Sequence, residues 1–437
     1  MKAKMSSLAG NAAAVLVAAF ATSASAADPA DPLQRAASIQ KDVAEIRGLP
    51  FRKPVPMEKQ TPEGLGRHME KEMQDAVPPA LAKHFDKIVR RVGLYRGPVI
   101  DDYRAMMRTV MESQVAAYYD PDSGRIYLLD EGGDALEQGV IYSHELYHAL
   151  QDQYFDLNGY VSDKLKLDSD QMLARVAVVE GEATYICMVW GIRQMTNGVT
   201  PPRALVGPVI AMQAGMDVAG LREMVGEAAA GAKVEVDKIP PFILETLVGN
   251  YLKGAAFVFA VQGQGWPAVE KLYKEYPPQS TEQILHPEKW LAREGVSRFK
   301  WPDFDKERAL RDWELIDEDV IGEIQWRIIF KVNGEQPAGA EAAAAGWNGD
   351  RYAVFKRKGA EDTLLLLRTS WDSEAEAAQF VEAYRRALAV KYQGITEATA
   401  LEQQGTEVFI VEGGLREDLA ALTRIVQQVK ATTRGTP

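Results

Sequence analysis

Two histidines separated by three residues set the strongest constraint on how this chain can fold. Segment 143–148 reads S-H-E-L-Y-H, which has the form H-E-x-x-H. Residues i and i+4 lie on one face of an α-helix, so a helix would place His144 and His148 side by side. Two imidazoles one turn apart can both reach a zinc ion (Zn²⁺) at about 2.0–2.1 Å, with Glu145 beside them. In such sites the glutamate polarises the metal-bound water and is not itself a ligand.

The residues around this motif have the pattern of a buried helix. Asp134 and Glu137 are a candidate N-terminal capping pair, and no proline interrupts the sequence between residues 131 and 153. Gly139 weakens the helix slightly. One flank carries apolar residues at helical spacing, namely Leu136, Val140, Ile141, Tyr147, Ala149 and Leu150. The alternative is a chance match on an ordinary core helix.

The first residues predict export. Lys2 and Lys4 precede an apolar run from Ala12 to Ala21, and residues 23–26 read S-A-S-A, as at the cleavage site of a secretory signal peptide. We expect cleavage after Ala26 and a periplasmic or secreted mature chain. A membrane anchor is the alternative, but the apolar run is shorter than the roughly 20 residues of a spanning helix. We expect no integral membrane span in the mature chain.

The charge balance bears on the partners. The chain holds 50 basic and 62 acidic residues, and removal of the two signal-segment lysines leaves 48 basic residues, a balance of −14. An acidic exported protein is poorly suited to bind nucleic acid or an anionic membrane surface. We therefore expect no nucleic-acid partner.

A β-hairpin is expected immediately before the motif helix. The β-rich runs 114–119 and 125–129 flank a turn of sequence D-P-D-S-G. An edge strand at this place could pair with an extended peptide substrate by β-augmentation. A purely structural hairpin is the alternative, and the sequence leaves both open.

A second long helix is expected at 168–190, opening with Asp168 and Gln171 as a capping pair. Its apolar face carries Glu180, and a buried carboxylate needs a partner because an unpaired charge is expensive. Zinc supplies one, and two histidines with a glutamate are a known ligand set. Glu180 is the first choice as the third ligand and Glu182 the second. The two side chains point about 200° apart around the helix, so only one of them can face the metal. A solvated acidic patch is the alternative.

The H-E-x-x-H motif with a downstream glutamate resembles the zincin metallopeptidases, specifically the gluzincin branch. The resemblance implies His144, His148 and Glu180 as zinc ligands and Glu145 as the general base in peptide-bond hydrolysis. It also implies a peptide or protein substrate. Related sites use a histidine at a loop end to stabilise an oxyanion, and His286 is a candidate for that role. A structural or surface role for His286 is the alternative.

Four other side chains are given simpler interpretations. Asp152, one turn after His148, is either a partner for an imidazole N–H or a solvated helix end. His68 and His84 fall on polar helices and are expected at the surface. Cys187, the only cysteine, lies in an apolar run and is expected to be a buried structural thiol.

The sequence pattern changes after residue 322. Segment 323–332 alternates apolar and polar residues and predicts a half-buried strand, and 334–346 predicts a Gly/Ala-rich loop. Further elements are expected at 351–357, 363–369 and 407–411 (strands) and at 373–392 and 415–430 (helices). This unit holds no histidine and no catalytic constellation, so a structural or substrate-recruiting role is expected. Before it, segment 196–241 predicts a helical cover or a peripheral insertion.

These features predict an α+β protein with a signal peptide at 1–26 and two domains. Residues 27–322 would form a mainly helical zincin-like metallopeptidase domain, with an N-terminal arm at 27–60, and residues 323–437 a small α+β domain. The expected function is an exported zinc-dependent metallopeptidase. One alternative is an exported zinc-binding or scaffolding protein without turnover, against which the intact Glu145 argues. The other is an interaction protein whose motif is accidental. The oligomeric state stays open.

Overall fold

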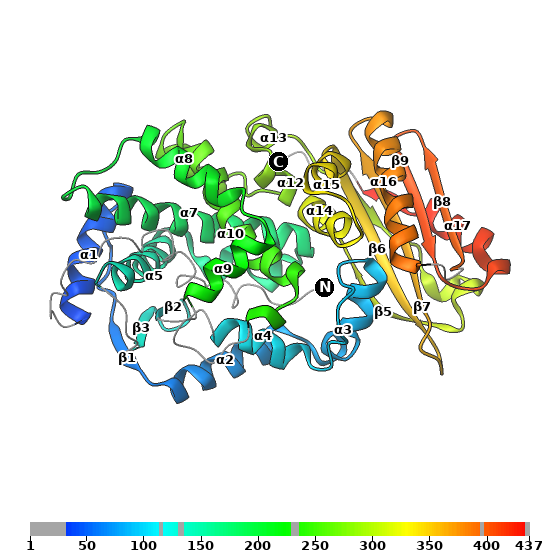
Figure 1. Cartoon of the computed structure of the whole chain (residues 1–437), viewed down its shortest axis with the longest axis horizontal. Coiled ribbons are helices and arrows are strands. Elements are labelled where there is room, and N and C mark those ends of the chain that lie inside the picture. Colours follow the sequence, from blue (N-terminus) through cyan, green and yellow to red (C-terminus); the bar gives the residue numbers. More distant parts are fainter. Residues whose placement is uncertain (1–31, 113–116, 130–134, 229–235, 394–396, 433–437) are drawn as a thin grey trace.

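The computed structural model describes residues 32–112, 117–129, 135–228, 236–393 and 397–432. The molecule is elongated, with a helical half at one end and an antiparallel sheet at the other (Figure 1). The expected α+β class is confirmed, because helices and strands are largely segregated along the chain. The predicted signal segment and the predicted cap Asp134 lie outside the described residues.

Helices dominate the chain up to residue 291. They are α1 (Pro32–Arg47), α2 (Pro62–Ala76), α3 (Pro79–Val92), α4 (Tyr103–Glu112), α5 (Ala135–Phe155), α6 (Leu157–Tyr160), α7 (Ser169–Met195), α8 (Arg203–Ala214), α9 (Val218–Ala228), α10 (Pro241–Gln262), α11 (Trp266–Lys274), α12 (Thr281–Leu285) and α13 (Pro287–Leu291). The motif helix and the second long helix are thus confirmed as α5 and α7. The predicted capping box of Asp168 and Gln171 begins α7. Segment 196–241 contains α8 and α9.

A small sheet precedes α5 in the chain. The predicted hairpin is confirmed as β2 (Ala117–Asp120) and β3 (Arg125–Leu129), which pair antiparallel. A strand that the sequence analysis missed, β1 (Met57–Gln60), comes from the N-terminal arm and pairs parallel with β3. The order β1-β3-β2 leaves β2 at an edge of this sheet.

Helices α7 and α10 form the centre of the helical half and cross in backbone contact. A Cβ atom added at Gly254 would lie 2.0 Å from the carbonyl oxygen of Ala177, and one at Gly181 would lie 2.2 Å from the carbonyl carbon of Gly254. Only glycine allows two backbones to approach so closely. At Gly139 of α5 the neighbour is a side chain, since an added Cβ atom would lie 2.2 Å from the ring of Trp190. Glycines that weaken these helices locally are therefore required by their packing.

The C-terminal half is built on a five-stranded antiparallel sheet of order β5-β6-β7-β9-β8. Its central strand β7 carries four consecutive leucines, 364–367, because both of its faces are covered. Leu365 and Leu367 face the main core, whereas Leu364 and Leu366 face a second, smaller core. The elements of this half are β4 (Arg298–Lys300), β5 (Trp313–Asp319), α14 (Gly322–Val332), α15 (Pro337–Ala344), β6 (Trp347–Arg357), β7 (Thr363–Trp371), α16 (Glu374–Tyr392), β8 (Thr399–Gln404), β9 (Glu407–Glu412), α17 (Leu419–Gln427) and β10 (Lys430–Thr432), which pairs with β4.

Two predictions for this half were wrong. Segment 323–332 is the helix α14 and not a strand, and the expected loop at 334–346 contains the helix α15. Helix α14 is buried on most of its circumference, including the side of Gln325. When nearly every face is buried, an alternating pattern no longer distinguishes a strand from a helix.

A distant carboxylate fixes the start of α14. The backbone N–H groups of Ile321 and Gly322 donate to Asp350 of β6 at 2.7 and 3.1 Å, and the indole N–H of Trp326 donates to it at 3.0 Å. These bonds satisfy N-terminal groups that a helix leaves unpaired. Because the cap lies in another strand, the local sequence does not reveal it. The sheet also begins at Trp313, before the expected boundary at residue 323.

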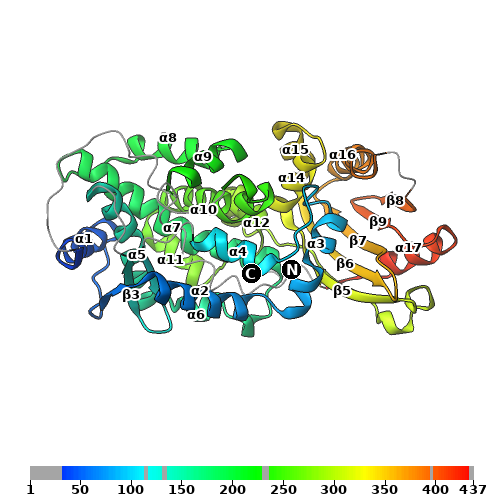
Figure 2. The same cartoon turned by 60° about the horizontal axis from the view of Figure 1, so that its bottom comes forward.

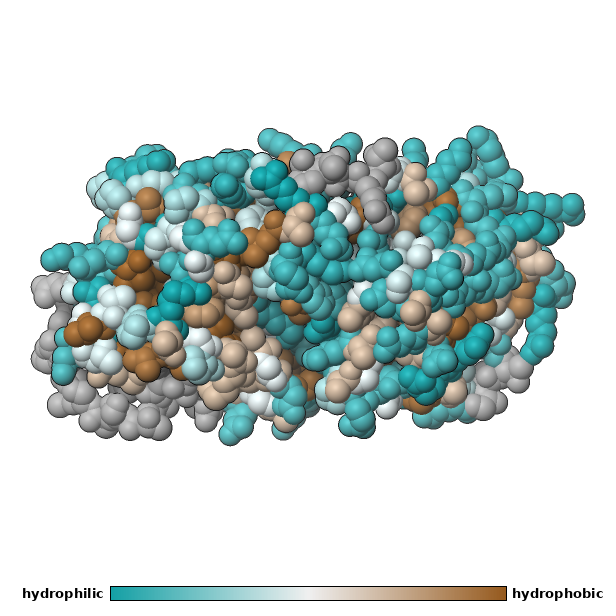
Figure 3. Space-filling view, turned by 90° about the horizontal axis from the view of Figure 1, so that it is seen from above, coloured by the Kyte–Doolittle hydropathy of each residue, from teal (hydrophilic) through white to brown (hydrophobic). Residues whose placement is uncertain are grey.

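The surface of the helical half exposes some large apolar side chains. Leu205 and Met212 of α8 are among them, and Figure 3 looks onto this side of the molecule, where several brown areas lie over the helical half. Among the described residues, α10 is long and apolar enough to cross a membrane, and the bent pair α8 and α9 would count as a second candidate. The most apolar 18-residue stretch of α10 is 78% buried within the molecule, as in many core helices.

We predict that Gly254→Ala destabilises the protein, because the added methyl group collides with the α7 backbone. The expected loss in the free energy of unfolding is about 1–3 kcal/mol, the usual range for overpacking. Urea denaturation followed by circular dichroism measures it. Gly66→Ala on α2 is the matched control, since its methyl group would meet nothing within 4 Å. A neutral Gly254→Ala would contradict the close crossing.

Candidate metal centre

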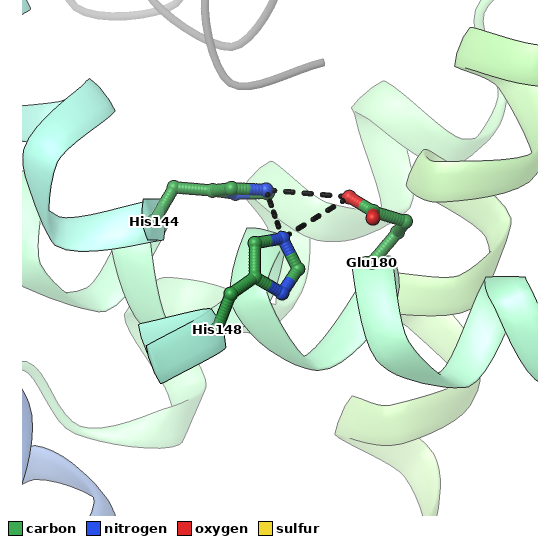
Figure 4. A group of neighbouring side chains, drawn as sticks. All are labelled: His144, His148 and Glu180. Carbon is green, nitrogen blue, oxygen red and sulfur yellow. Dashed lines mark hydrogen bonds and ion pairs between the residues drawn. The ribbon is translucent and has the colours of Figure 1, made fainter. Parts of the chain in front are cut away.

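Two neighbouring helices bring the candidate ligands together. His144 and His148 project from one face of α5, and Glu180 projects from α7, which packs against α5 (Figure 4). The three side chains are buried, and each offers one ligand atom to a common point. The structure therefore assembles His144, His148 and Glu180 into one cluster.

The distances within this cluster match the size of a zinc ion. The Nε2 atoms of His144 and His148 lie 2.9 Å apart, and they lie 3.3 and 3.5 Å from Oε2 of Glu180. A triangle with these sides has a circumradius of about 1.9 Å, so a cation just outside its plane would lie at about the 2.0–2.1 Å expected for zinc. The donor set of two imidazoles and a carboxylate also suits zinc.

Gln151 orients one of the imidazoles. His148 donates from Nδ1 to Oε1 of Gln151 at 2.8 Å, which leaves the lone pair on Nε2 for a metal. The Gln151 amide is held in turn, because it donates to the carbonyl oxygen of Val179 at 3.0 Å and to the hydroxyl of Tyr273 at 2.8 Å. The sequence analysis missed Gln151. Its position three residues after His148 on the same helix face was the available signal.

Asp152, for which two roles were left open, performs neither of them. Its carboxylate accepts from the hydroxyl of Tyr119 at 2.8 Å and from the backbone N–H of Leu157 at 2.9 Å. Asp152 thus joins the end of α5 to β2 and to α6.

Glu145 lies next to the cluster and is held by one of its two oxygens. The backbone N–H of Tyr119 in β2 donates to Oε2 at 2.7 Å, whereas the buried Oε1 has no hydrogen-bond partner within the described part of the chain. Burial raises the pKa of Glu145 to about 8, against the lowering effect of His148. A carboxylate with one anchored and one free oxygen, and with a raised pKa, is suited to accept a proton near neutral pH.

The charges of the cluster depend on one another. Burial would raise the pKa of Glu180, but His148 outweighs it and lowers that pKa below the usual value. Burial would likewise lower the pKa of His148, but Glu180 raises it to about 9. The second oxygen of Glu180 and Nδ1 of His144 are buried without a hydrogen-bond partner in the described residues. The unpartnered oxygen of Glu180 fits a site that is completed by a cation, whereas a cation at Nε2 of His144 would leave its Nδ1 as it is.

Glu182, the second choice as a ligand, does not join the cluster and contacts it only through Gln151, whose amide donates to it at 3.3 Å. Its Oε1 accepts from Nε of Arg47 at 2.9 Å, and its Oε2 accepts from the hydroxyl of Tyr273 at 2.7 Å. Arg47 also donates to the hydroxyl of Tyr147, so that tyrosine faces away from the cluster. All of these groups are buried. The structure thus uses Glu180 in the cluster and Glu182 in an ion pair that joins α7 to α1.

His286, the candidate for oxyanion stabilisation, lies at the contact of α12 and α14. Its Nε2 is 3.0 Å from Oε1 of Glu323 and 3.4 Å from a guanidinium nitrogen of Arg327. None of the interactions described for His286 involves the cluster. The geometry thus favours the structural interpretation of this histidine.

The other side chains named in the sequence analysis, Cys187, His68 and His84, lie outside the cluster. Cys187 is buried, as predicted. His68 and His84 are half-buried, and His68 stacks on Tyr118 with ring centroids 4.4 Å apart. Tyr251 of α10 was missed by the sequence analysis. Its phenol is buried, and its pKa is raised by that burial and by the charge of Glu180.

A second group of carboxylates already surrounds a cation. Oxygens of Glu282, Glu294 and Asp372 lie close enough together to hold a metal ion. However, the ammonium of Lys289 lies 2.6 Å from both Glu282 and Asp372 and 3.1 Å from Glu294. The lysine supplies the positive charge that this group needs.

Comparison with known proteins addresses only the C-terminal half. A family model described as "Domain of unknown function (DUF8575)" matches residues 311–423, which run from just before β5 into α17. No curated protein and no solved structure matches the chain. The match does not extend to α5 or α7.

We predict that Arg47→Met lowers the free energy of unfolding by about 3–5 kcal/mol, because it leaves the buried Glu182 carboxylate without its counter-charge. Chemical denaturation measures the change. Arg311→Met, at an exposed position, is the matched control and should change stability by less than about 0.5 kcal/mol. The double variant with Glu182→Gln should recover part of the loss. A loss below 1 kcal/mol for the single variant would show that the pair is not buried as described.

Proposed function

We propose that this protein is an exported zinc-dependent metallopeptidase with a zincin-like catalytic half. The proposal rests on one observation, the convergence of His144, His148 and Glu180 on a point sized for zinc, beside the free oxygen of Glu145. The predicted signal peptide supports export. His144, His148 and Glu180 would hold the metal, and Gln151 would fix one ligand ring.

Bound zinc would activate a water molecule and polarise the scissile carbonyl group. The chain's own contribution is proton transfer by Glu145, whose Oε1 is free to take the proton of the attacking water and then to pass it to the leaving amine. The N–H of Tyr119 fixes Oε2 and so aims the other oxygen. Burial excludes competing water from the carboxylate.

Strand β2 supports a peptide as the substrate. It is an edge strand, and the N–H of Tyr119 on its outer side contacts Glu145 directly. An extended peptide that paired with this edge would therefore run past the catalytic carboxylate. Ala117, Tyr118 and Tyr119 are themselves buried, so the same hairpin also has the structural role of holding Glu145.

A second candidate is a zinc-binding protein without turnover. The observation that favours it is the complete burial of the site, since the side chains of His144, Glu145 and Glu180 are 0% exposed. Structural zinc sites are closed in this way, whereas catalytic sites keep an open position. Under this candidate, zinc would hold α5 to α7. Activity measurements separate the two candidates.

We predict one zinc ion per chain in protein purified without chelators, measured by elemental analysis. Gln151→Ala should weaken zinc binding about 10–100-fold, because His148 loses the partner that fixes its ring. The matched control Gln194→Ala, at an exposed position near the end of α7, should bind zinc normally. A substoichiometric zinc content in the wild-type protein would contradict both candidates.

We predict that Glu145→Gln retains zinc but reduces peptide hydrolysis at least about a hundredfold, since the amide cannot accept the proton. Cleavage of casein and of a peptide library, with and without a chelator, provides the assay. Glu63→Gln on the exposed side of α2 is the control and should keep wild-type activity. Unchanged hydrolysis in Glu145→Gln would exclude the mechanism. Absence of chelator-sensitive cleavage in the wild type would favour the non-catalytic candidate.

A further inference from the structure

A cavity of about 270 Å³ lies where the helical half meets the sheet half. It is lined by the turn between α8 and α9, by α10, and by α14 and α15. Both Figure 1 and Figure 2 show α9, α10, α14 and α15 close together at this junction. Its size is near the lower end of the range of about 300–1,000 Å³ for ligand pockets. It therefore suits a small ligand.

The wall of this cavity is apolar on one side and charged on the other. Ile324 and Ile328 of α14, with Met216 and Val218 beside α9, provide the apolar part. The charged part has three cations, namely Lys253, Arg327 and Lys331.

Two of these cations already have carboxylate partners. Arg327 donates twice to Glu323, at 2.6 and 3.0 Å, and Lys331 pairs with Glu245. Of the other carboxylates of the wall, Glu341 is 63% exposed and lies 3.9 Å from Arg327, and the remaining two are hydrogen-bonded. Glu335 accepts from Arg386, and Asp217 accepts from a backbone N–H at the start of α9.

Lys253 is different, because no ion pair is formed by it within the described residues. Its ammonium has one acceptor there, the carbonyl oxygen of Gly249, at the long distance of 3.5 Å. Burial and, to a smaller extent, the nearby Arg327 lower the pKa of Lys253 to about 8, with Glu341 opposing them. An ammonium held in this way is missing a counter-charge.

We propose that this cavity binds a small apolar molecule with a single carboxylate, and that the carboxylate pairs with Lys253. The ammonium of Lys253 carries one positive charge, which a single carboxylate would neutralise. A phosphate dianion would bring a second charge next to Glu245 and Glu341, both of which line the cavity. The apolar wall of α14 and α9 would accept the rest of the ligand. Both an aliphatic acid and the C-terminal residue of a peptide have this chemistry.

The site is separate from the proposed zinc centre, but α10, which carries Lys253, packs against α7, which carries Glu180. Lys253 precedes Gly254, whose backbone contacts α7 at Ala177. The ligand would join α9 and α10 to α14, so it would connect the two halves of the molecule.

Calorimetric titration of the full mature protein tests the proposal. The probes are hexanoate and N-acetyl-leucine, each compared with its neutral amide, so that the two pairs represent an aliphatic acid and a peptide C-terminus. We expect the wild type to bind at least one acid at least tenfold more tightly than its amide. Whichever acid shows this preference identifies the source of the ligand.

Lys253→Met should bring the ratio of acid to amide affinity close to one, whereas Lys271→Met, at an exposed position on α11, should leave it unchanged. Both variants keep His144, His148 and Glu180, so carboxylate binding to a metal cannot produce the difference. Ala219→Phe, at an exposed position of the cavity wall, should block acid and amide alike and serves if Lys253→Met does not fold. No preference for either acid in the wild type, a preference that persists in Lys253→Met, or unchanged binding in Ala219→Phe would each overturn the proposal.

Discussion

The structure depends on how one buried helix accommodates its carboxylates. Helix α7 buries Asp168, Asp170, Glu180 and Glu182, and each buried charge is unfavourable unless it is paired or neutralised. Arginines pair with the first and the last of these. Among the described residues, Asp170 accepts from the backbone and hydroxyl of Thr281, and burial raises its pKa well above the usual value. Glu180 is the only one of the four whose partners are imidazoles.

This difference is the one expected between a metal site and an ordinary buried ion pair, and it supports the proposed zinc site. An arginine satisfies a carboxylate completely, as Arg47 and Tyr273 do for Glu182. The two imidazoles reach only Oε2 of Glu180, and its Oε1 has no hydrogen-bond partner in the described residues. A divalent cation resolves the conflict, since it bonds to the carboxylate and to both ring nitrogens at once. The same constraint therefore explains why Glu182 stabilises the fold while Glu180 remains available for chemistry.

The sequence predicted those parts of the structure that depend on short spacing. The facing histidines follow from the helical period, the start of α7 from the Asp168 cap, and the hairpin from its turn residues. What it could not predict depends on distant partners. The different roles of Glu180 and Glu182 depend on Arg47, which lies in another helix and pairs with Glu182. Similarly, the N-terminus of α14 is capped by Asp350, which lies in a strand that follows α14 in the chain. Strand β1 likewise exists only through its pairing with β3.

The first turn of α7 has a consequence for how this protein can be divided. Asp168 pairs with Arg298, and Ser169 donates from its backbone and its hydroxyl to Asp319 of β5. The helix that carries Glu180 is thus fastened at its beginning to the sheet, within the region that other chains share as a family of unknown function. Exchange of that region between proteins would leave these groups without partners. A protein that carries this region without the start of α7 would therefore need another partner for the carboxylate at the position of Asp319.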